Sequence, residues 1–202
     1  MTSIKLQKTA PKNKPEVEDT RTRILDATAS LIRQKGFKAT TVRDIGEAVG
    51  LYSGSLFHYF RTKHDILMEI LRTAFITVCE RHETTLASSL SPQDKLRQFI
   101  YNEIRLVFIE DQGDYHAVLY FDWRDAAPGH LPELIQLRKR YFQSWTELIR
   151  QCHEGGHLRG DPKISVRVLE GTLRGMMSWY RPTGMYSPEE MADQVLIVVA
   201  RP

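Results

Sequence analysis

A group of polar side chains between residues 41 and 63 could hydrogen-bond to nucleic acid. Arginine, lysine, serine, threonine and tyrosine donate to phosphate oxygens, and several of these residue types also reach base edges in the major groove. The candidates for DNA contact are Thr41, Arg43, Tyr52, Ser53, Ser55, His58, Tyr59 and Lys63. Taken alone, His58 is typical of any exposed surface and Tyr59 of a half-buried core. The grouping of these residues is therefore what indicates a DNA-binding site.

The segments that carry this group have helix-turn-helix spacing. Two short helices are predicted, one capped by Thr41 and one capped by Ser53 and running to Phe60, and Gly50 lies where the chain must reverse between them. Small residues at the start of the second helix suit a major groove about 12 Å wide. Lys63 is expected to open the next helix, where free backbone amides favour a phosphate. The residues expected to pack inward are Val42, Ile45, Ala48, Val49, Leu51, Leu56, Phe57 and Phe60.

Charge is unevenly distributed along the chain. Residues 1–64 contain 12 Lys and Arg against 6 Asp and Glu, a balance of +6, whereas residues 65–202 contain 16 against 19, a balance of −3. Cations near phosphates gain affinity by counterion release, so the basic third is the part expected to meet a polyanion. On charge alone, a solvated basic face is the alternative. Residues 1–18, with four lysines, are predicted to be a disordered basic arm.

The rest of the chain has helical periodicity together with helical start signals. Apolar residues recur at helical spacing, and no segment alternates as a half-buried strand would. The clearest pairs of N-cap and first-turn proline are Ser91-Pro92, Asp161-Pro162 and Ser187-Pro188. We predict an all-α protein of nine helices. A three-helix unit is expected at residues 19–64 and a larger helical domain at residues 65–202.

The run from Ala39 to Phe60, followed by Lys63 to Leu67, resembles the DNA-binding segment of the TetR family of bacterial repressors. The nine-helix layout is similar over nearly the whole chain. This resemblance implies a homodimer whose N-terminal domains bind a palindromic DNA operator and whose C-terminal domains bind a small effector that releases DNA. Tyr52 departs from the pattern, because a bulky residue occupies a turn position there. No operator sequence follows from the resemblance.

Aromatic residues of the larger domain are candidates for an effector site. Such residues at helical spacing are usually core, but an apolar cavity between helices with a few polar groups is where a small molecule binds. The ligand candidates are Phe108, Tyr120, Trp123, Trp145 and Arg174. The segment from Ser178 to Glu190 resembles a C-terminal feature of TetR members that govern fatty-acid and sterol side-chain breakdown. That likeness implies a largely apolar effector, with acyl-CoA the first to test.

The last two predicted helices carry the signals for a homodimer. Gly171 and Gly175 lie four residues apart on one helix, so a partner helix could approach closely there; a tight contact inside one subunit is the alternative. Apolar residues on the final helix support an interface at about residues 162–200. The interface candidates are Gly171, Gly175, Met176, Val195 and Val199.

The sequence lacks the motifs of an enzyme or a cofactor-binding protein. GxSxG, HExxH, P-loop and GxGxxG patterns are absent, so catalysis and a cofactor are not expected. Glycines interrupt the helical spacing of Cys152, His153 and His157, which argues against a metal site. No stretch approaches the roughly 18 apolar residues of a membrane span, and a cytoplasmic location is expected. The competing interpretation is a helical ligand-binding protein without sequence-specific DNA binding.

Overall fold

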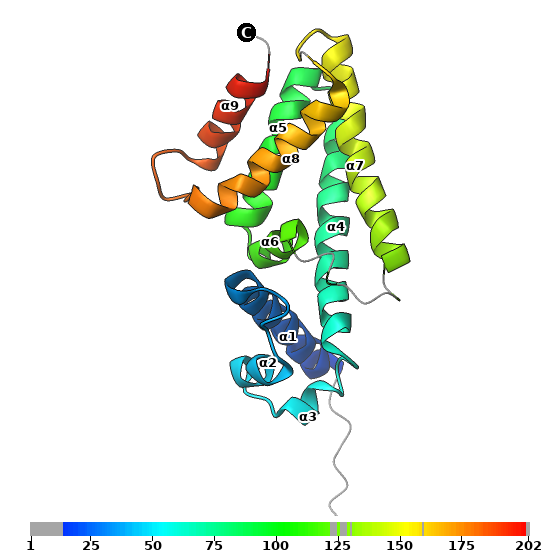
Figure 1. The fold of residues 1–202 in the computed structure, drawn as a ribbon, viewed down its shortest axis with the longest axis vertical. Coiled ribbons are helices and arrows are strands. Elements are labelled where there is room, and N and C mark those ends of the chain that lie inside the picture. The colour runs from blue at the N-terminus through cyan, green and yellow to red at the C-terminus, as the bar shows by residue number, and fades with distance from the viewer. Residues whose placement is uncertain (1–13, 122–124, 126–128, 130, 159, 201–202) are drawn as a thin grey trace, which may run out of the picture.

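The computed structural model describes residues 14–121, 125, 129, 131–158 and 160–200 (Figure 1). These residues form nine helices and no β-strand, which confirms the all-α prediction. None of their helices is both long enough and apolar enough to cross a bilayer. The helices are α1 (Lys14–Lys35), α2 (Val42–Val49), α3 (Ser53–Leu56), α4 (Lys63–Ala87), α5 (Pro92–Phe108), α6 (Gly113–Phe121), α7 (Leu131–Glu154), α8 (Pro162–Trp179) and α9 (Pro188–Val199).

Helix α4 joins the two parts of the molecule. At one end α1, α2 and α3 gather around its start, and from there α4 runs along the larger domain (Figure 1). In that domain α4 packs against α5, α6 and α7, while α8 packs against α7 and α5, and α9 packs against α5. Helix α6 contacts both α1 and α4. A shift of α4 or α6 would therefore be felt directly by α1.

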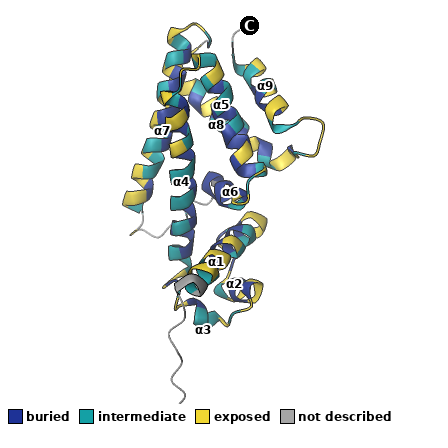
Figure 2. Ribbon diagram, turned by 180° about the vertical axis from the view of Figure 1, so that it is seen from behind, coloured by how far each residue is buried: buried dark blue, intermediate teal, exposed yellow. Residues whose placement is uncertain are grey.

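A single buried apolar cluster continues through both parts. It extends from Ile24 and Ile45 in the N-terminal helices through Leu67 and Phe75 on α4 to Leu148 on α7, and each of these side chains is 2% exposed or less. Figure 2 shows the buried faces of the helices turned inward and the exposed residues on the outer surface. Since interiors of this kind are close-packed, the N-terminal unit is packed onto the larger domain and is not merely tethered to it.

Local capping explains where several helices begin. Thr41 and Thr62 each accept a hydrogen bond from the backbone amide three residues on, and the carboxylates of Asp44 and Asp65 accept from the threonine amides in return. Each reciprocal pair satisfies two backbone N–H groups that the helix leaves free. The same arrangement opens α9. These starts agree with the positions predicted from the sequence.

Helix α1 begins earlier than expected, at Lys14, inside the segment predicted to be a disordered arm. Pro15 suits a first helical turn because its missing N–H is not needed there, and the acidic residues Glu18 and Asp19 favour the positive end of the helix dipole. The preceding part of that segment lies outside the described residues. The predicted domain boundary after residue 64 falls in the first turn of α4, a helix that serves both parts.

Helix α3 is shorter than predicted. It spans Ser53–Leu56, and the chain continues to Phe60 through tight turns, with the Tyr59 amide donating to the Leu56 carbonyl oxygen at 2.9 Å. Tyr52 is the N-cap residue and makes no side-chain cap, so the prediction that Ser53 caps this helix was wrong. A helix this short is not stable through its own hydrogen bonds. Burial of Leu56 and Phe60 is what fixes the segment.

Candidate nucleic-acid interface

The reversal between α2 and α3 depends on two glycines. Gly50 ends α2 in the left-handed conformation, with φ 72°, which side chains rarely adopt. One turn earlier, a Cβ added at Gly46 would lie 2.6 Å from the carbonyl oxygen of Leu51, whose amide donates to the Gly46 carbonyl at 2.8 Å. Sequence reasoning identified Gly50 but missed Gly46. Only the folded turn brings Leu51 back onto α2.

The outer face of α2, the turn and α3 is open to solvent. Tyr52 is 89% exposed, His58 is exposed, and nothing lies within 4 Å of the position where Gly54 would carry a Cβ. Arg43 is exposed as well, and its Nε lies 2.8 Å from a carboxylate oxygen of Glu47 one turn further on. The arrangement places long side chains around a slim helix start, as entry into a major groove requires.

The remaining candidates of this segment are less exposed. Ser53 and Ser55 are half-buried, and the half-buried ring of Tyr59 packs against the core. The carbonyl oxygen of Tyr59 accepts a hydrogen bond from Arg21 of α1 at 3.0 Å. Thr41 is exposed, and its hydroxyl is occupied as the cap of α2. These residues therefore stabilise the conformation of the exposed face, and part of each side chain remains accessible to solvent.

Two packing predictions for this segment were wrong. Ala48 and Phe57 were expected to face inward, but both are exposed, Phe57 by 53%. Ala48 lies on the solvent side of α2 next to the buried Val49. Helix α3 ends at Leu56, so Phe57 no longer follows the helical spacing that would have turned its ring to the core. Phe57 thus adds an apolar side chain to the exposed face.

Lys63 has an intramolecular role that the sequence did not indicate. Its ammonium donates to the carbonyl oxygens of Phe37 at 2.8 Å and Thr40 at 2.7 Å, and it lies 4.0 Å from the centre of the Phe37 ring. Burial lowers the pKa of Lys63, while the charges of Asp125 and Asp44 act to raise it. Two of its three N–H groups are thus used to fasten α4 to the α1–α2 connection. Its contact with a phosphate stays a prediction.

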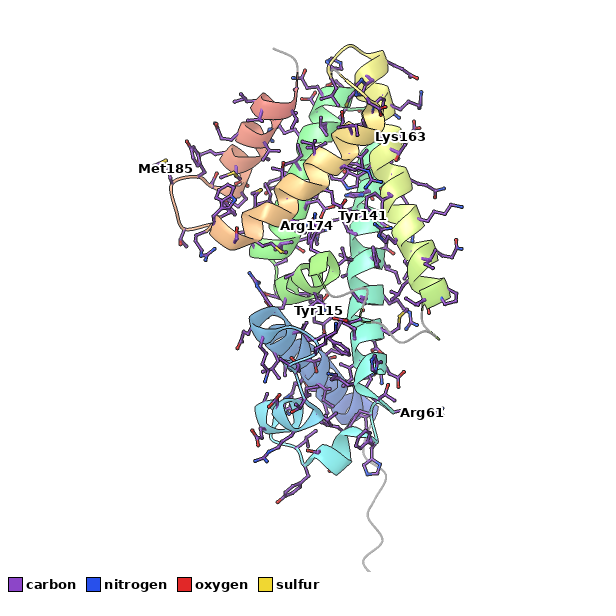
Figure 3. All side chains as sticks on the ribbon, in the orientation of Figure 1. Arg61, Tyr115, Tyr141, Lys163, Arg174 and Met185 are labelled. Atoms are coloured by element: carbon purple, nitrogen blue, oxygen red, sulfur yellow. The ribbon has the colours of Figure 1, made fainter. Side chains whose placement is uncertain are left out.

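Arg61 is a cation at the same edge that sequence reasoning missed. It is exposed, and it forms no hydrogen bond or ion pair with the described residues. Figure 3 shows its side chain extending outward beside the start of α4. A free guanidinium can bind a phosphate in a bidentate manner. The sequence signal that could have indicated Arg61 is its position one residue before the Thr62 cap of α4.

A buried polar cluster lies at the centre of the larger domain. Glu103 is 3% exposed and accepts hydrogen bonds from the hydroxyls of Tyr120 at 2.6 Å and Tyr141 at 2.9 Å. The Nε2 of His82 lies 3.3 Å from the Glu103 carboxylate without hydrogen-bond geometry. Burial acts to raise the pKa of Glu103, but His82 and the two hydroxyls outweigh it and lower the pKa. Sequence reasoning missed Glu103 and His82. The signal in the sequence that could have indicated them was an ionisable residue among apolar neighbours.

Two of the predicted ligand residues belong to this cluster. Tyr120 is 9% exposed and Trp145 2% exposed, and the indole of Trp145 packs edge-on against the His82 ring with 5.5 Å between centroids. The ring of His82 also stacks on Phe99 at 4.0 Å. Both predicted residues are therefore part of a packed core in this structure.

The other ligand candidates lie elsewhere, so the predicted set does not converge on one site. Phe108 is half-buried and packs edge-on against Tyr180 at 5.0 Å. Arg174 is exposed and lines a separate cavity between α1, α6 and α8. Trp123 lies outside the described residues. These ligand candidates were grouped by residue type, although they are distant in sequence. The packing of the helices places them at separate sites.

The predicted interface residues also divide into two groups. Met176 is fully buried and Val195 is 7% exposed, so both belong to the subunit's own core and are not available to a partner. Nothing lies within 4 Å of a Cβ built on Gly171 or Gly175, and Val199 is half-buried. Exposed large apolar residues on the same two helices were missed by sequence reasoning: Ile164, Val168, Trp179, Ile197 and Val198, each at least 50% exposed.

A helix-turn-helix unit joined by one long helix to a larger helical domain defines a class of DNA-binding regulators. Residues 24–70 match the family model for bacterial regulatory proteins of the tetR family, and residues 89–201 match the model for a tetracyclin repressor-like C-terminal domain. The chain belongs to the TetR family of bacterial transcriptional regulators.

Relatives and solved structures agree with this assignment. The HTH-type transcriptional repressor KstR2 of Rhodococcus jostii (strain RHA1) is 29% identical over 195 residues, which cover 92% of this chain and 94% of that protein. The structure of the ketosteroid transcriptional regulator KstR2 of Mycobacterium tuberculosis has a TM-score of 0.78 at 25% identity, covering 90% and 95% of the two chains. AibR in complex with isovaleryl coenzyme A and operator DNA has the same fold, with a TM-score of 0.80 at 20% identity and coverage of 91% and 99%.

Proposed function

We propose that this chain is a transcriptional repressor that binds a palindromic operator as a homodimer and leaves it when a small effector binds. The observation that carries this proposal is the open face around Gly54, where Tyr52 and His58 flank a slim helix start on a helix-turn-helix of the TetR family. Thr41, Arg43, Ser53, Ser55, Tyr59 and Lys63 complete the proposed interface. Serines are suited to base contacts, and the cations to phosphates.

Selection of bound sites from random duplex DNA tests this function against the alternative of a ligand-binding protein without sequence-specific DNA binding. We expect an enriched palindrome whose half-sites lie about one helical turn, or a multiple of it, apart. Binding to that palindrome should exceed binding to a shuffled duplex by at least about 10³-fold at near-physiological salt. Equal binding to both duplexes would leave only the alternative.

The proposed dimer is formed by the exposed sides of α8 and α9. On α8, Ile164, Val168 and Trp179 are spaced so that they follow one side of the helix. Ile197 and Val198 on α9 are 70% and 83% exposed, and exposed apolar groups of this size mark association surfaces. A two-fold dimer would present two α3 helices to half-sites related by the same symmetry.

The proposed effector is a small, largely apolar molecule, and acyl-CoA thioesters are the first class to test. The KstR2 relatives are named for ketosteroid regulation, and AibR shows that this fold can hold isovaleryl coenzyme A and operator DNA together. Helices α4 and α6 contact both the larger domain and α1, so they offer the route from effector to DNA. An effector acts only through its different affinity for the DNA-bound and released arrangements.

A further inference from the structure

A cavity of about 580 Å³ lies between the N-terminal unit and the larger domain. Its walls come from the end of α1, the middle of α6 and the C-terminal half of α8. The volume falls within the range of small-molecule sites, about 300–1,000 Å³. Figure 3 shows Arg174 on α8 on the larger-domain side of this region, above Tyr115 of α6 and the end of α1. A molecule bound here would touch both parts of the protein at once.

The cavity has an apolar wall on α1 and α6 and open space along α8. Ile32 of α1 and Val118 of α6, each 1% exposed, line it on one side. On the other side Gly171 and Gly175 leave space, because nothing lies within 4 Å of a Cβ at either position. A glycine inside a helix costs about 1 kcal/mol relative to alanine, so two of them open the cavity at the expense of helix stability.

Two guanidinium groups line the same cavity. Arg174 is exposed and forms no ion pair with any described residue. Arg33 donates to the carboxylate of Asp114 at 2.8 Å, in an ion pair whose side chains are 40% and 32% exposed. An ion pair this open to solvent is weak, so a second anion can compete for Arg33. The cavity therefore offers two cations: Arg174, which has no ion pair with the described residues, and Arg33, whose present partner is exchangeable.

We infer that this cavity binds an apolar molecule carrying an anionic group. The apolar part covers Ile32 and Val118, and the anion pairs with Arg174 and competes with Asp114 for Arg33. The Arg33–Asp114 pair links α1 to α6, and a hydrogen bond from the Tyr115 hydroxyl to the Asp26 carboxylate at 2.8 Å links the same two helices. Loss of the first link loosens α1 from α6. Binding of this molecule does not depend on the proposed function. Only the inference that its binding releases DNA rests on that function.

Direct binding measurements test the site on the full-length protein without DNA. The probes are decanoate, decanoyl-CoA and, as an uncharged match, decanol, each followed by calorimetry. We expect decanoate or decanoyl-CoA to bind about fivefold more tightly than decanol, as one exposed charge pair would give. Which of the two binds more tightly identifies the anion as a carboxylate or a coenzyme A phosphate. Equal affinities for all three probes would overturn the inference.

Arg174→Gln and Arg167→Gln form a matched pair of variants. Both residues are exposed cations on α8, but Arg167 lines a different groove between α7 and α8. Arg174→Gln should weaken binding of the anionic probe about fivefold, and Arg167→Gln should leave it unchanged. The opposite pattern would place the ligand in the α7–α8 groove and overturn the inference.

Two further variants separate a site from a merely structural effect. Asp114→Asn frees Arg33 and should raise affinity for the anionic probe two- to fivefold, whereas a fall in affinity would contradict the competition. Ser178→Phe fills the cavity and should abolish binding; the hydroxyl that it removes donates to the Gly175 carbonyl oxygen of the same helix at 2.8 Å. If the probe binds as expected and operator affinity does not change, the binding site is supported, but its role as the effector site is contradicted.

Discussion

The ammonium of Lys63 lies 2.7 Å from the carbonyl oxygen of Thr40, at the end of the connection between α1 and α2. Lys63 opens α4, so this hydrogen bond fixes the helix-turn-helix unit to the helix that leads into the larger domain. The carbonyl of Phe37 shares the same ammonium at 2.8 Å. One partly buried cation thus helps to fix the orientation of α2 and α3 relative to α4.

Replacement of Lys63 by glutamine should therefore lower stability. Loss of hydrogen bonds from a charged donor to two carbonyl groups is expected to reduce the free energy of unfolding by about 1–3 kcal/mol. Urea denaturation of the variant and the wild type gives this difference. Unchanged stability would show that the two bonds contribute nothing net.

Salt titration of operator binding tests Arg61 and Lys63 as phosphate contacts. We expect Arg61→Gln to flatten the slope of log K against log salt by about 0.9, the value for one lost phosphate contact. Lys63→Gln is measured in parallel, and the same change would support the phosphate contact proposed for its third N–H group. An unchanged slope would remove the residue concerned from the DNA interface.

Ser55 is expected to influence the choice of sequence more than total affinity. It lies on α3, half-buried, with its hydroxyl free of any hydrogen bond to the described residues. Ser55→Ala should change the ranking of operators that differ by single base pairs, each worth about 1–3 kcal/mol, and leave binding to a shuffled duplex unaltered. Competition binding with a set of single-base variants checks this. A uniform loss of affinity across the set would contradict a base contact.

Association should depend on the exposed apolar residues of α8 and α9. Val168→Glu and Ile197→Glu place a charge at positions that are 50% and 70% exposed, so they should give monomers without unfolding the subunit. Ile109→Glu is the matched control, because Ile109 is 48% exposed at the end of α5 and should leave the dimer intact. Light scattering reports the mass. Dimers in both α8 and α9 variants would place the interface elsewhere.

His116 should make the protein less stable in acid. It is 4% exposed, and burial lowers its pKa from 6.5 to about 4, while Glu103 acts in the opposite direction. Between these pH values the unfolded chain binds a proton that the folded protein does not, so stability is lost as the pH falls from 6.5 to about 4. The loss attributable to this group is about 3 kcal/mol.

Comparison with His116→Gln isolates that contribution, since glutamine does not titrate. The wild type should lose more stability than the variant across the same pH interval, measured by urea denaturation at each pH. Parallel pH profiles would show that His116 does not titrate in this interval.

The sequence by itself determined the class of fold and most helix starts. The capping pairs Thr41–Asp44 and Thr62–Asp65 span three residues, and Gly50 needs only its own backbone to end α2. Interactions of this range are fixed by local chemistry, so they can be read directly from the chain. The helix-turn-helix and its family resemblance follow from the same short segment.

Only the tertiary structure decided which distant side chains meet. Asp114 and Arg33 are 81 residues apart, and the hydrogen bond between Tyr141 and Glu103 spans 38 residues. The direction in which Lys63 points and the burial of Met176 have the same origin. Each depends on how whole helices pack against one another. The fit between side chains of different helices decides that packing, and the residue spacing within one segment does not contain this information.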